Sequence, residues 1–284
     1  TPAGSEMALE ALSLGAVEVV AKPGSAYSVK EISRQLVQKI RVAAGAHVMS
    51  SSGVGEKVRP SVSPVEGGTP MRTTHKVLAI GASTGGTRAI EDVLVHMPPD
   101  IPGTVIVQHM PEHFTRGFAR RLNELCPMEV REASHNDPIV PGLVLIAPGN
   151  RHMVVQRSGA KYFVMLKDGP PVHYQRPSVD VLFHSVARQV GANAIGVILT
   201  GMGADGAAGL LAMRNAGAYT IVQDEKSCVV YGMPKAAVEV GAARTVLPLD
   251  RIGVSVIEVL TGGVAPQLVG PGQAGSQTHG CLLY

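Results

Sequence analysis

Apolar residues in this sequence come in short uninterrupted runs, separated by stretches in which apolar and polar positions repeat with a helical period. Runs without charge are typical of strands that are buried on both faces of a sheet. The runs cover residues 77–80, 104–108, 143–147, 194–200 and 219–223. The helical patterns cover residues 87–95, 114–126, 178–190 and 207–216. Their alternation predicts an α/β fold, with a doubly wound, mostly parallel sheet and helices on both faces.

Two stretches lack any apolar period. Residues 50–74 consist mostly of Gly, Pro, Ser and Thr, and a similar composition with Gln begins near residue 261. Such segments cannot bury enough apolar surface to offset the entropy of ordering them. We therefore predict a flexible linker over 50–74, a disordered tail over 261–284, a folded body over 75–260 and a separate piece over 1–49. The looser alternation of residues 154–166 predicts a hairpin inserted into the body.

Composition narrows the classes of function. The 284 residues are 45% hydrophobic and 4% aromatic, contain no Trp and carry a formal net charge of +3. This excludes an aromatic platform or a broad basic surface for nucleic acid. Cys126, Cys228 and Cys281 form no C-x-x-C pair, so we expect neither a disulfide framework nor a thiolate metal site. Without a signal peptide or an apolar run of about 18–20 residues, we predict a cytoplasmic protein with no membrane insertion.

The loop after the first predicted strand reads G-A-S-T-G-G, from Gly81 to Gly86. Gly81, Ser83 and Gly85 fit G-x-S-x-G, a strand-to-helix turn that lifts a serine hydroxyl above a sheet. The amide groups and dipole of the following helix suit a developing oxyanion. The motif alone is weak, because glycine-rich turns also bind phosphate or simply reverse the chain. Ser83 is therefore a candidate nucleophile at this point.

The loop after the second strand begins H-M-P, with His109 directly at the strand end. A histidine there is well placed to act as general base for a serine on a neighbouring strand. A structural histidine is the alternative, and a metal pair with His113 is another. Pro111 between the two histidines disfavours one helical face that carries both, and no third ligand is evident.

The loop after the fourth strand reads T-G-M-G-A-D-G. Gly201, Gly203 and Gly206 fit G-x-G-x-x-G, and Asp224 follows where a dinucleotide-binding acid is expected. A dinucleotide-binding oxidoreductase is therefore an alternative. Against it, Asp205 would point a carboxylate into the helix N-terminus where a pyrophosphate should sit. An acid in this loop is better suited to orient an imidazole.

Together the loops offer a hydroxyl, an imidazole and a carboxylate at the ends of three strands. We predict that Ser83 is the nucleophile, His109 the general base and Asp205 the residue that orients it. This chain order differs from that of α/β-hydrolases, in which the acid precedes the histidine.

Several long motifs between residues 77 and 260 resemble the catalytic domain of the chemotaxis response-regulator protein-glutamate methylesterases. They are G-A-S-T-G-G, V-Q-H-M-P-E-H-F-T, A-P-G-N, R-P-S-V-D-V-L-F, I-L-T-G-M-G-A-D-G and Y-G-M-P-K. The resemblance implies the same catalytic roles for Ser83, His109 and Asp205, and an oxyanion hole that includes the backbone N–H of Met202. We add Thr84, Gly85 and Gly86 as oxyanion or substrate residues.

The resemblance implies hydrolysis of γ-glutamyl methyl esters on chemotaxis receptors and deamidation of receptor glutamines. No metal or organic cofactor is implied. The partners are the cytoplasmic domains of the receptors and the histidine kinase of the same two-component pathway. A non-enzymatic adaptor that keeps the fold remains a further alternative.

Residues 1–49 resemble the last part of a receiver domain. The expected elements are a helix over 4–15, a strand over 16–23 that places Lys22 at its end, and a helix over 29–44. The strands that carry the phosphorylated aspartate of a receiver are not among these 284 residues. We therefore expect a receiver remnant that is not phosphorylated at that site.

Overall fold

A computed structural model describes residues 75–262 continuously, and residues 7–8, 10–12, 14–19, 36–37, 40 and 43–44 before them. Lys22, the predicted linker over 50–74 and the tail beyond residue 262 lie outside the described residues.

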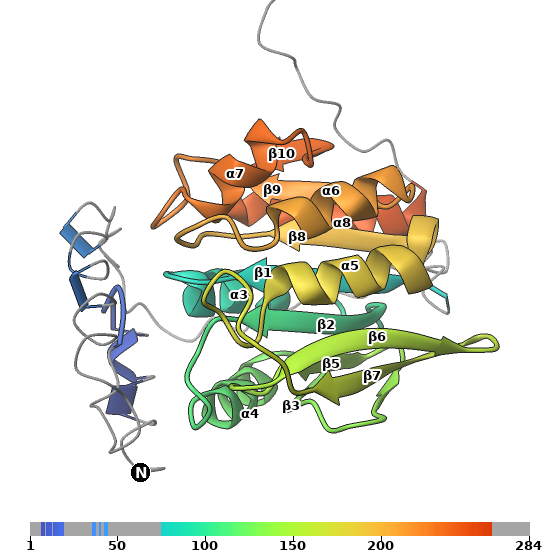
Figure 1. Cartoon of the computed structure of the whole chain (residues 1–284), viewed down its shortest axis with the longest axis horizontal. Helices are drawn as coiled ribbons and strands as arrows, with labels where there is room; N and C mark the ends of the chain where they lie inside the picture. The colour runs from blue at the N-terminus through green and yellow to red at the C-terminus, as the bar shows by residue number, and fades with distance from the viewer. Residues whose placement is uncertain are drawn as a thin grey trace, which may run out of the picture.

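The centre of the described body is a sheet of seven strands (Figure 1). Their spatial order is β10-β9-β8-β1-β2-β5-β3, and every neighbouring pair is parallel. The bounds are β1 Val77–Ala82, β2 Gly103–Gln108, β3 Glu129–Glu132, β5 Leu143–Ile146, β8 Ala194–Ile198, β9 Tyr219–Gln223 and β10 Thr245–Leu247. β1, β2, β5 and β8 are buried at every position, as the uninterrupted apolar runs predict.

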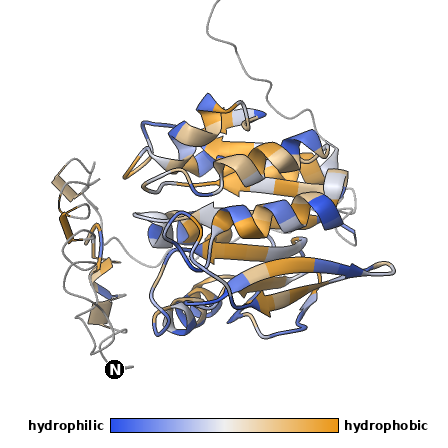
Figure 2. Ribbon diagram, viewed as in Figure 1, coloured by the Kyte–Doolittle hydropathy of each residue, from blue (hydrophilic) through white to orange (hydrophobic). Residues whose placement is uncertain are grey.

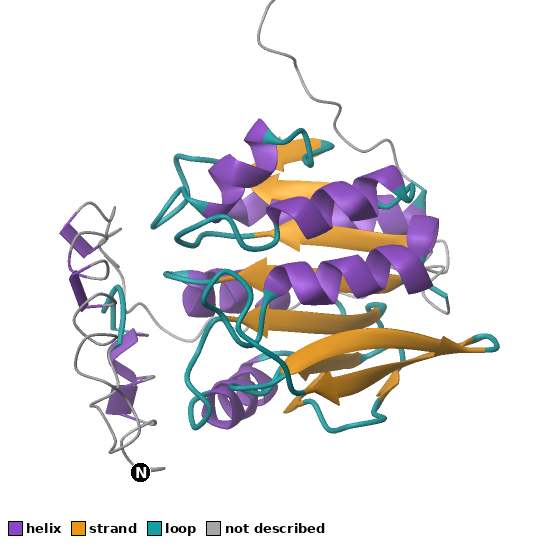
Figure 3. Ribbon diagram, in the orientation of Figure 1, coloured by secondary structure: helices purple, strands orange, loops and turns teal. Residues whose placement is uncertain are grey.

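The order of the strands creates a switch point next to β1. From β1 the chain places β2, β3 and β5 on one side, with β5 between β2 and the edge strand β3, and then returns to place β8, β9 and β10 on the other side. Because the strands are parallel, their carboxyl ends all point to one edge, on the left of Figure 3. The loops that follow β1 and β8 diverge at this point, which is where open α/β sheets form their binding crevices.

Helices cover both faces of the sheet. One face carries α3 (Gly86–Val95), α4 (Thr115–Leu125) and α8 (Leu249–Thr261), and the other carries α5 (Val179–Gln189), α6 (Ala207–Asn215) and α7 (Met233–Glu239). Each layer forms its own hydrophobic cluster with the sheet. Figure 2 shows the apolar strands between helices whose exposed sides are polar. The predicted doubly wound α/β fold is confirmed.

A second, antiparallel sheet packs beside α5 on the same face. It consists of β4 (Pro138–Ile139), β6 (His152–Ser158) and β7 (Lys161–Lys167), in the order β4-β7-β6. β6 and β7 are the inserted hairpin that the sequence predicts over 154–166, with each strand somewhat longer than expected. A short 3-10 helix, Gly191–Asn193, precedes β8.

The four helices and five strands predicted for the body are present, with ends that differ by one or two residues. Several elements escaped prediction, namely β3, β4, α7, β10 and α8. The prediction of a tail from residue 261 is wrong at its first residue, because α8 continues through Thr261 and Gly262 closes it in a left-handed conformation (φ 76°). Among the described residues, no helix has the length and apolar character needed to cross a membrane.

The described part of the N-terminal piece supports two predicted elements and contradicts one. Residues 7–8 and 10–12 are helical, as are 36–37, 40 and 43–44, within the two predicted helices. Residues 16–19 form no strand, although a strand was predicted over 16–23. A strand needs a neighbour to accept and donate its backbone hydrogen bonds, and no described strand pairs with these residues.

Candidate active site

Ser83 lies in the turn between β1 and α3, at the carboxyl edge of the sheet. Its N–H donates to the carbonyl of Thr200 at 3.0 Å, and its carbonyl accepts from Gly86 N at 2.8 Å. Three glycines around this turn leave no room for a Cβ, and at Gly86 a Cβ would lie 2.6 Å from Ala82 Cβ. A Cβ on Gly81 would approach Val179 Cγ1 to 2.3 Å, and Gly85 has a φ of 76° and only 2.7 Å to Val229 Cβ. The turn therefore holds Ser83 against the neighbouring strand end.

Gln108, the last residue of β2, connects the serine loop to the histidine loop. Its Nε2 donates to the carbonyls of Ser83, at 2.8 Å, and of His109, at 3.2 Å. The side chain is buried, and its Oε1 has no hydrogen-bond partner among the described residues. Sequence analysis missed this residue. The available signal was an amide side chain at the end of an otherwise apolar run.

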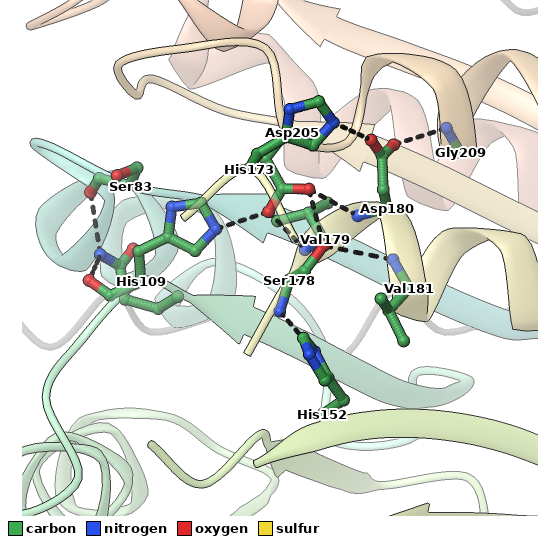
Figure 4. Close-up of polar contacts among 11 residues, drawn as sticks. Ser83, His109, His152, His173, Ser178, Val179, Asp180, Val181, Asp205 and Gly209 are labelled. Atoms are coloured by element: carbon green, nitrogen blue, oxygen red, sulfur yellow. Dashed lines mark hydrogen bonds and ion pairs between the residues drawn. The ribbon is translucent and has the colours of Figure 1, made fainter. Parts of the chain in front are cut away.

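His109 follows β2 and lies between Ser83 and Asp205 (Figure 4). Its Nε2 donates to Asp205 Oδ2 at 2.8 Å, and the two side chains are only 5% and 2% exposed. Because Nε2 carries the proton toward the carboxylate, Nδ1 of the neutral ring is the acceptor nitrogen. Nδ1 is buried and has no hydrogen-bond partner among the described residues.

Asp205 follows β8 and is held by the N-terminus of α5. Its carboxylate accepts from Val179 N at 2.8 Å, Asp180 N at 3.0 Å and Ser178 Oγ at 2.8 Å, besides His109. Burial raises the pKa of Asp205, but the His109 bond and charge and the other donors outweigh this effect. The pKa therefore lies below the ordinary value of 3.8, and the carboxylate is ionised at neutral pH.

The position of Asp205 corrects one sequence expectation. Asp205 was expected to face the N-terminus of the helix that follows it, α6. Its carboxylate instead binds the N-terminus of α5, which precedes it in the chain. The close approach depends on Gly206, whose φ is 95° and where a Cβ would lie 2.6 Å from Val179 Cγ1.

A second imidazole and carboxylate lie beside this pair. His173 Nε2 donates to Asp180 Oδ2 at 3.0 Å, and Asp180 Oδ1 accepts from Gly209 N at 2.6 Å. Nitrogen or oxygen atoms of His173, Asp180 and Asp205 lie within 4.8 Å of one another. Sequence analysis missed both residues, because the hairpin that brings His173 here has no apolar period.

His152 supports the same region from β6. Its Nδ1 accepts from Ser178 N at 3.2 Å, and its Nε2 donates to the carbonyl of Pro170 at 3.0 Å. Ser178 is the N-cap of α5 and donates its hydroxyl to Asp205. His152 thus fixes the backbone from which Asp205 is held. It was also missed by sequence analysis.

The predicted oxyanion residues differ in what they contact. Gly86 N donates to the Ser83 carbonyl, so this amide already has an acceptor in the structure, and the role of Gly86 at the site stays a prediction. Met202 lies in the loop before Asp205, next to Gly203, which has a φ of 93°. Thr84 is buried, and its Oγ1 donates to Glu18 Oε2 at 2.8 Å.

A shallow pocket opens over Ser83 and His109. The loops after β1 and β2 form one wall, and the N-terminal segment forms the other. Its lining residues from that segment are Leu12, Val17, Glu18 and Val19. From the loops they include Ser83, Thr84, Gly85, Gln108, His109 and Met110.

The key residues of the two alternative sites, a dinucleotide-binding site and a histidine metal pair, make other contacts in the structure. Asp224, the candidate ribose ligand, accepts from Ser227 N at 3.0 Å and from its hydroxyl at 2.6 Å, within a local turn. His109, half of the candidate metal pair with His113, uses Nε2 for Asp205.

Comparisons with known proteins point to one family. The model of the CheB methylesterase family matches residues 78–256. The chain is 56% identical over 260 residues to protein-glutamate methylesterase/protein-glutamine glutaminase 2 of Syntrophus aciditrophicus, covering 92% of this chain and 75% of the relative. It is also 56% identical over 262 residues to protein-glutamate methylesterase/protein-glutamine glutaminase 4 of Anaeromyxobacter dehalogenans. This alignment covers 91% of this chain and 72% of the relative.

A solved structure agrees with these relatives. The CheB methylesterase catalytic domain of Thermotoga maritima is 37% identical, with a TM-score of 0.64, and the alignment covers 66% of this chain and 99% of that domain. Because the family model spans more than half of the chain and the curated relatives exceed half identity, the chain belongs to the CheB methylesterase family.

Proposed function

We propose that Ser83, His109 and Asp205 carry out the reaction of this methylesterase. The reaction removes methyl groups from γ-glutamyl methyl esters of chemotaxis receptors, and the same residues deamidate receptor glutamines. The names of the relatives and their identity to this chain support both activities. The observation that carries the residue assignment is the buried His109–Asp205 bond, which leaves an acceptor nitrogen free beside the Ser83 turn.

The chemistry follows from the protonation states. When the ester carbonyl lies against Ser83, the hydroxyl oxygen attacks the carbonyl carbon and His109 Nδ1 accepts the hydroxyl proton. The ionised carboxylate of Asp205 stabilises the imidazolium that forms. Collapse of the tetrahedral intermediate breaks the bond to the methoxy group, which leaves as methanol with the proton from His109.

Water then completes the turnover. His109 accepts a proton from the attacking water, the bond between Ser83 Oγ and the acyl carbon breaks, and the serine recovers its proton. The glutamate carboxylate is released. With a glutamine substrate the leaving group is ammonia, and the remaining steps are identical.

The backbone amides of Met202, Thr84 and Gly85 are the proposed donors to the oxyanion, since they belong to the two loops that flank Ser83. No hydrogen bond joins His109 Nδ1 to Ser83 in the described residues. Such bonds are often long in the absence of substrate and tighten when it binds.

We also propose the domain organisation that the sequence suggests, in which residues 1–49 belong to the C-terminal part of a receiver domain, residues 50–74 are a linker and residues 75–260 are the catalytic domain. The alignment with relatives supports it, because it covers 92% of the chain and so extends beyond residues 78–256. The proposed partners are the receptors and, through the receiver domain, the histidine kinase of the pathway.

The decisive test replaces the nucleophile. Ser83→Ala should lower the rate of methanol release from a methylated receptor fragment by about 10⁶-fold, as loss of the nucleophile does in other serine hydrolases. Its melting temperature should stay close to that of the wild type. A Ser83→Ala protein with wild-type turnover would overturn the assignment.

A fluorophosphonate probe separates an enzyme from an adaptor. The native wild type should be labelled at Ser83, whereas the denatured protein and Ser83→Ala should not. Failure of the native protein to react, together with no methanol release, would favour an adaptor.

A further inference from the structure

The loop between β7 and α5, residues 168–177, crosses the carboxyl edge of the sheet and is fastened at several points. Arg176 donates its Nη1 to the Gly169 carbonyl and its Nε to Asn150 Oδ1 at 3.0 Å. The Pro170 carbonyl accepts from His152 at 3.0 Å. The stem of this loop is therefore tied to β6 and to the loop that precedes it.

The tip of the loop is a two-residue hairpin with an unusual sequence. Val172 and Gln175 exchange backbone hydrogen bonds of 3.0 and 2.8 Å, and both residues between them are left-handed, His173 with φ 49° and Tyr174 with φ 61°. Such turns favour Asn and Gly, because a side chain destabilises the left-handed backbone. This chain places two large rings there instead.

The two rings differ in environment. His173 is half exposed and binds Asp180, and its ligand nitrogen lies within 4.8 Å of the Asp205 carboxylate. Tyr174 turns outward and is 95% exposed, the most exposed large hydrophobic side chain among the described residues. The hairpin thus places the exposed Tyr174 ring one residue away from His173, which lies beside the proposed catalytic acid Asp205.

The Tyr174 ring itself does not offset the conformational cost of its left-handed backbone, since the ring is almost entirely in water. Strained residues of this kind are characteristic of functional sites. Tyrosine is enriched among binding hot spots, and the backbone that carries this ring is fixed by the two hydrogen bonds of its turn.

We propose that Tyr174 is a substrate-contact residue that binds the receptor polypeptide next to the reacting glutamyl side chain. This inference rests on the proposed function. The ring packs on an apolar part of the polypeptide and does not reach the ester. It therefore contributes to binding of the protein substrate and not to the chemistry of Ser83.

The test compares Tyr174→Ala and Tyr174→Phe on a protein substrate and on a small probe. With a methylated receptor fragment, Tyr174→Ala should raise KM about tenfold with kcat unchanged, the scale of one hot-spot side chain. Tyr174→Phe keeps the ring and should stay near the wild type. The rate of Ser83 labelling by a small fluorophosphonate should be the same in all three proteins.

Tyr174→Gly separates contact from structure. Glycine relieves the left-handed strain, so the melting temperature should be unchanged or raised by about 2–4 °C, while KM for the receptor fragment rises as in Tyr174→Ala. If Tyr174 only stabilises the loop, the melting temperature falls and labelling of Ser83 slows, and the proposal is wrong.

Two controls make the outcome specific. Val254→Ala removes a 42% exposed side chain from α8, on the opposite face, and should change neither KM nor labelling. Binding of the receptor fragment to Ser83→Ala should weaken about tenfold when Tyr174→Ala is added. An unchanged KM in Tyr174→Ala refutes the contact, whereas absence of methanol release by the wild type refutes the proposed function itself.

Discussion

The carboxyl edge of the sheet holds two histidine–aspartate pairs of the same chemistry and nearly the same length. His109–Asp205 is 2.8 Å long with side chains 5% and 2% exposed, and His173–Asp180 is 3.0 Å long with side chains 50% and 6% exposed. The difference lies in the imidazole. The buried His109 ring keeps its second nitrogen away from water and available to a serine, whereas the half-exposed His173 ring anchors the loop that carries it.

The two carboxylates also interlock the helices on this face. Asp205, just before α6, accepts from the first amides of α5, and Asp180, in the first turn of α5, accepts from Gly209 in the first turn of α6. Each acid satisfies amides that a helix start leaves without intrahelical partners. The catalytic acid is thus positioned by an arrangement that also stabilises the fold.

Among substitutions in the two histidine–aspartate pairs, we expect Asp205→Asn to have the largest effect on activity. The amide group of Asn would place N–H donors among the Ser178, Val179 and Asp180 donors that surround Asp205. It would also favour the His109 tautomer with its proton on Nδ1, which cannot accept the serine proton. We expect kcat to fall about 10⁴-fold, as the corresponding change does in serine proteases. Initial rates of methanol release on a receptor fragment measure this. Recovery of full activity at saturating substrate would contradict the role of Asp205.

Asp180→Ala and His173→Ala test the second pair separately. Asp180→Ala leaves the Gly209 amide unpaired and should lower the free energy of unfolding by about 1–2 kcal/mol, the value of a helix cap. His173→Ala should cost less than about 1 kcal/mol, because the imidazole is half exposed. Urea unfolding gives both values. Equal losses from the two variants would mean that the ion pair, and not the cap, stabilises this region.

The smallest expected effect is a pH dependence of stability. The pKa of Asp205 is lower in the folded chain than its ordinary value of 3.8, so folding favours the ionised form. Its contribution is complete above that range and is lost as the pH falls below about 5 toward the folded pKa. The difference in unfolding free energy between the wild type and Asp205→Asn should therefore shrink from pH 6 to pH 3. A constant difference would show that the charge of Asp205 does not contribute.

The elements that sequence reasoning found are those with a strong periodic signal. β1 and β9 were predicted because they are buried runs, and α5 because Ser178 caps an amphipathic stretch. β3 was missed since an edge strand of Glu129–Glu132 carries charges that no apolar run would reveal. α8 could have been predicted, because Ile252, Val256 and Leu260 recur every four residues on its buried side.

In the site, the sequence pointed to residues whose chemistry is visible in a motif. Ser83 and His109 directly follow β1 and β2, and Asp205 lies in the loop after β8; parallel strands bring such loops together at one edge of the sheet. The supporting residues Gln108, His152 and Asp180 are set by tertiary contacts across 25 or more residues. Spacing along the chain contains no signal for these contacts, so they became visible only in the folded molecule.

The placement of β8 between β1 and β9 has a consequence for the folding of the enzyme during its synthesis. During synthesis, Ser83 and His109 emerge together with β1 and β2, which can pair at once. The acid that gives His109 its function emerges almost a hundred residues later and reaches it only after β8 has added to the free side of β1. A nascent chain that contains only Ser83 and His109 lacks the carboxylate that orients the imidazole, so we expect full hydrolytic activity only after β8 has joined the central sheet.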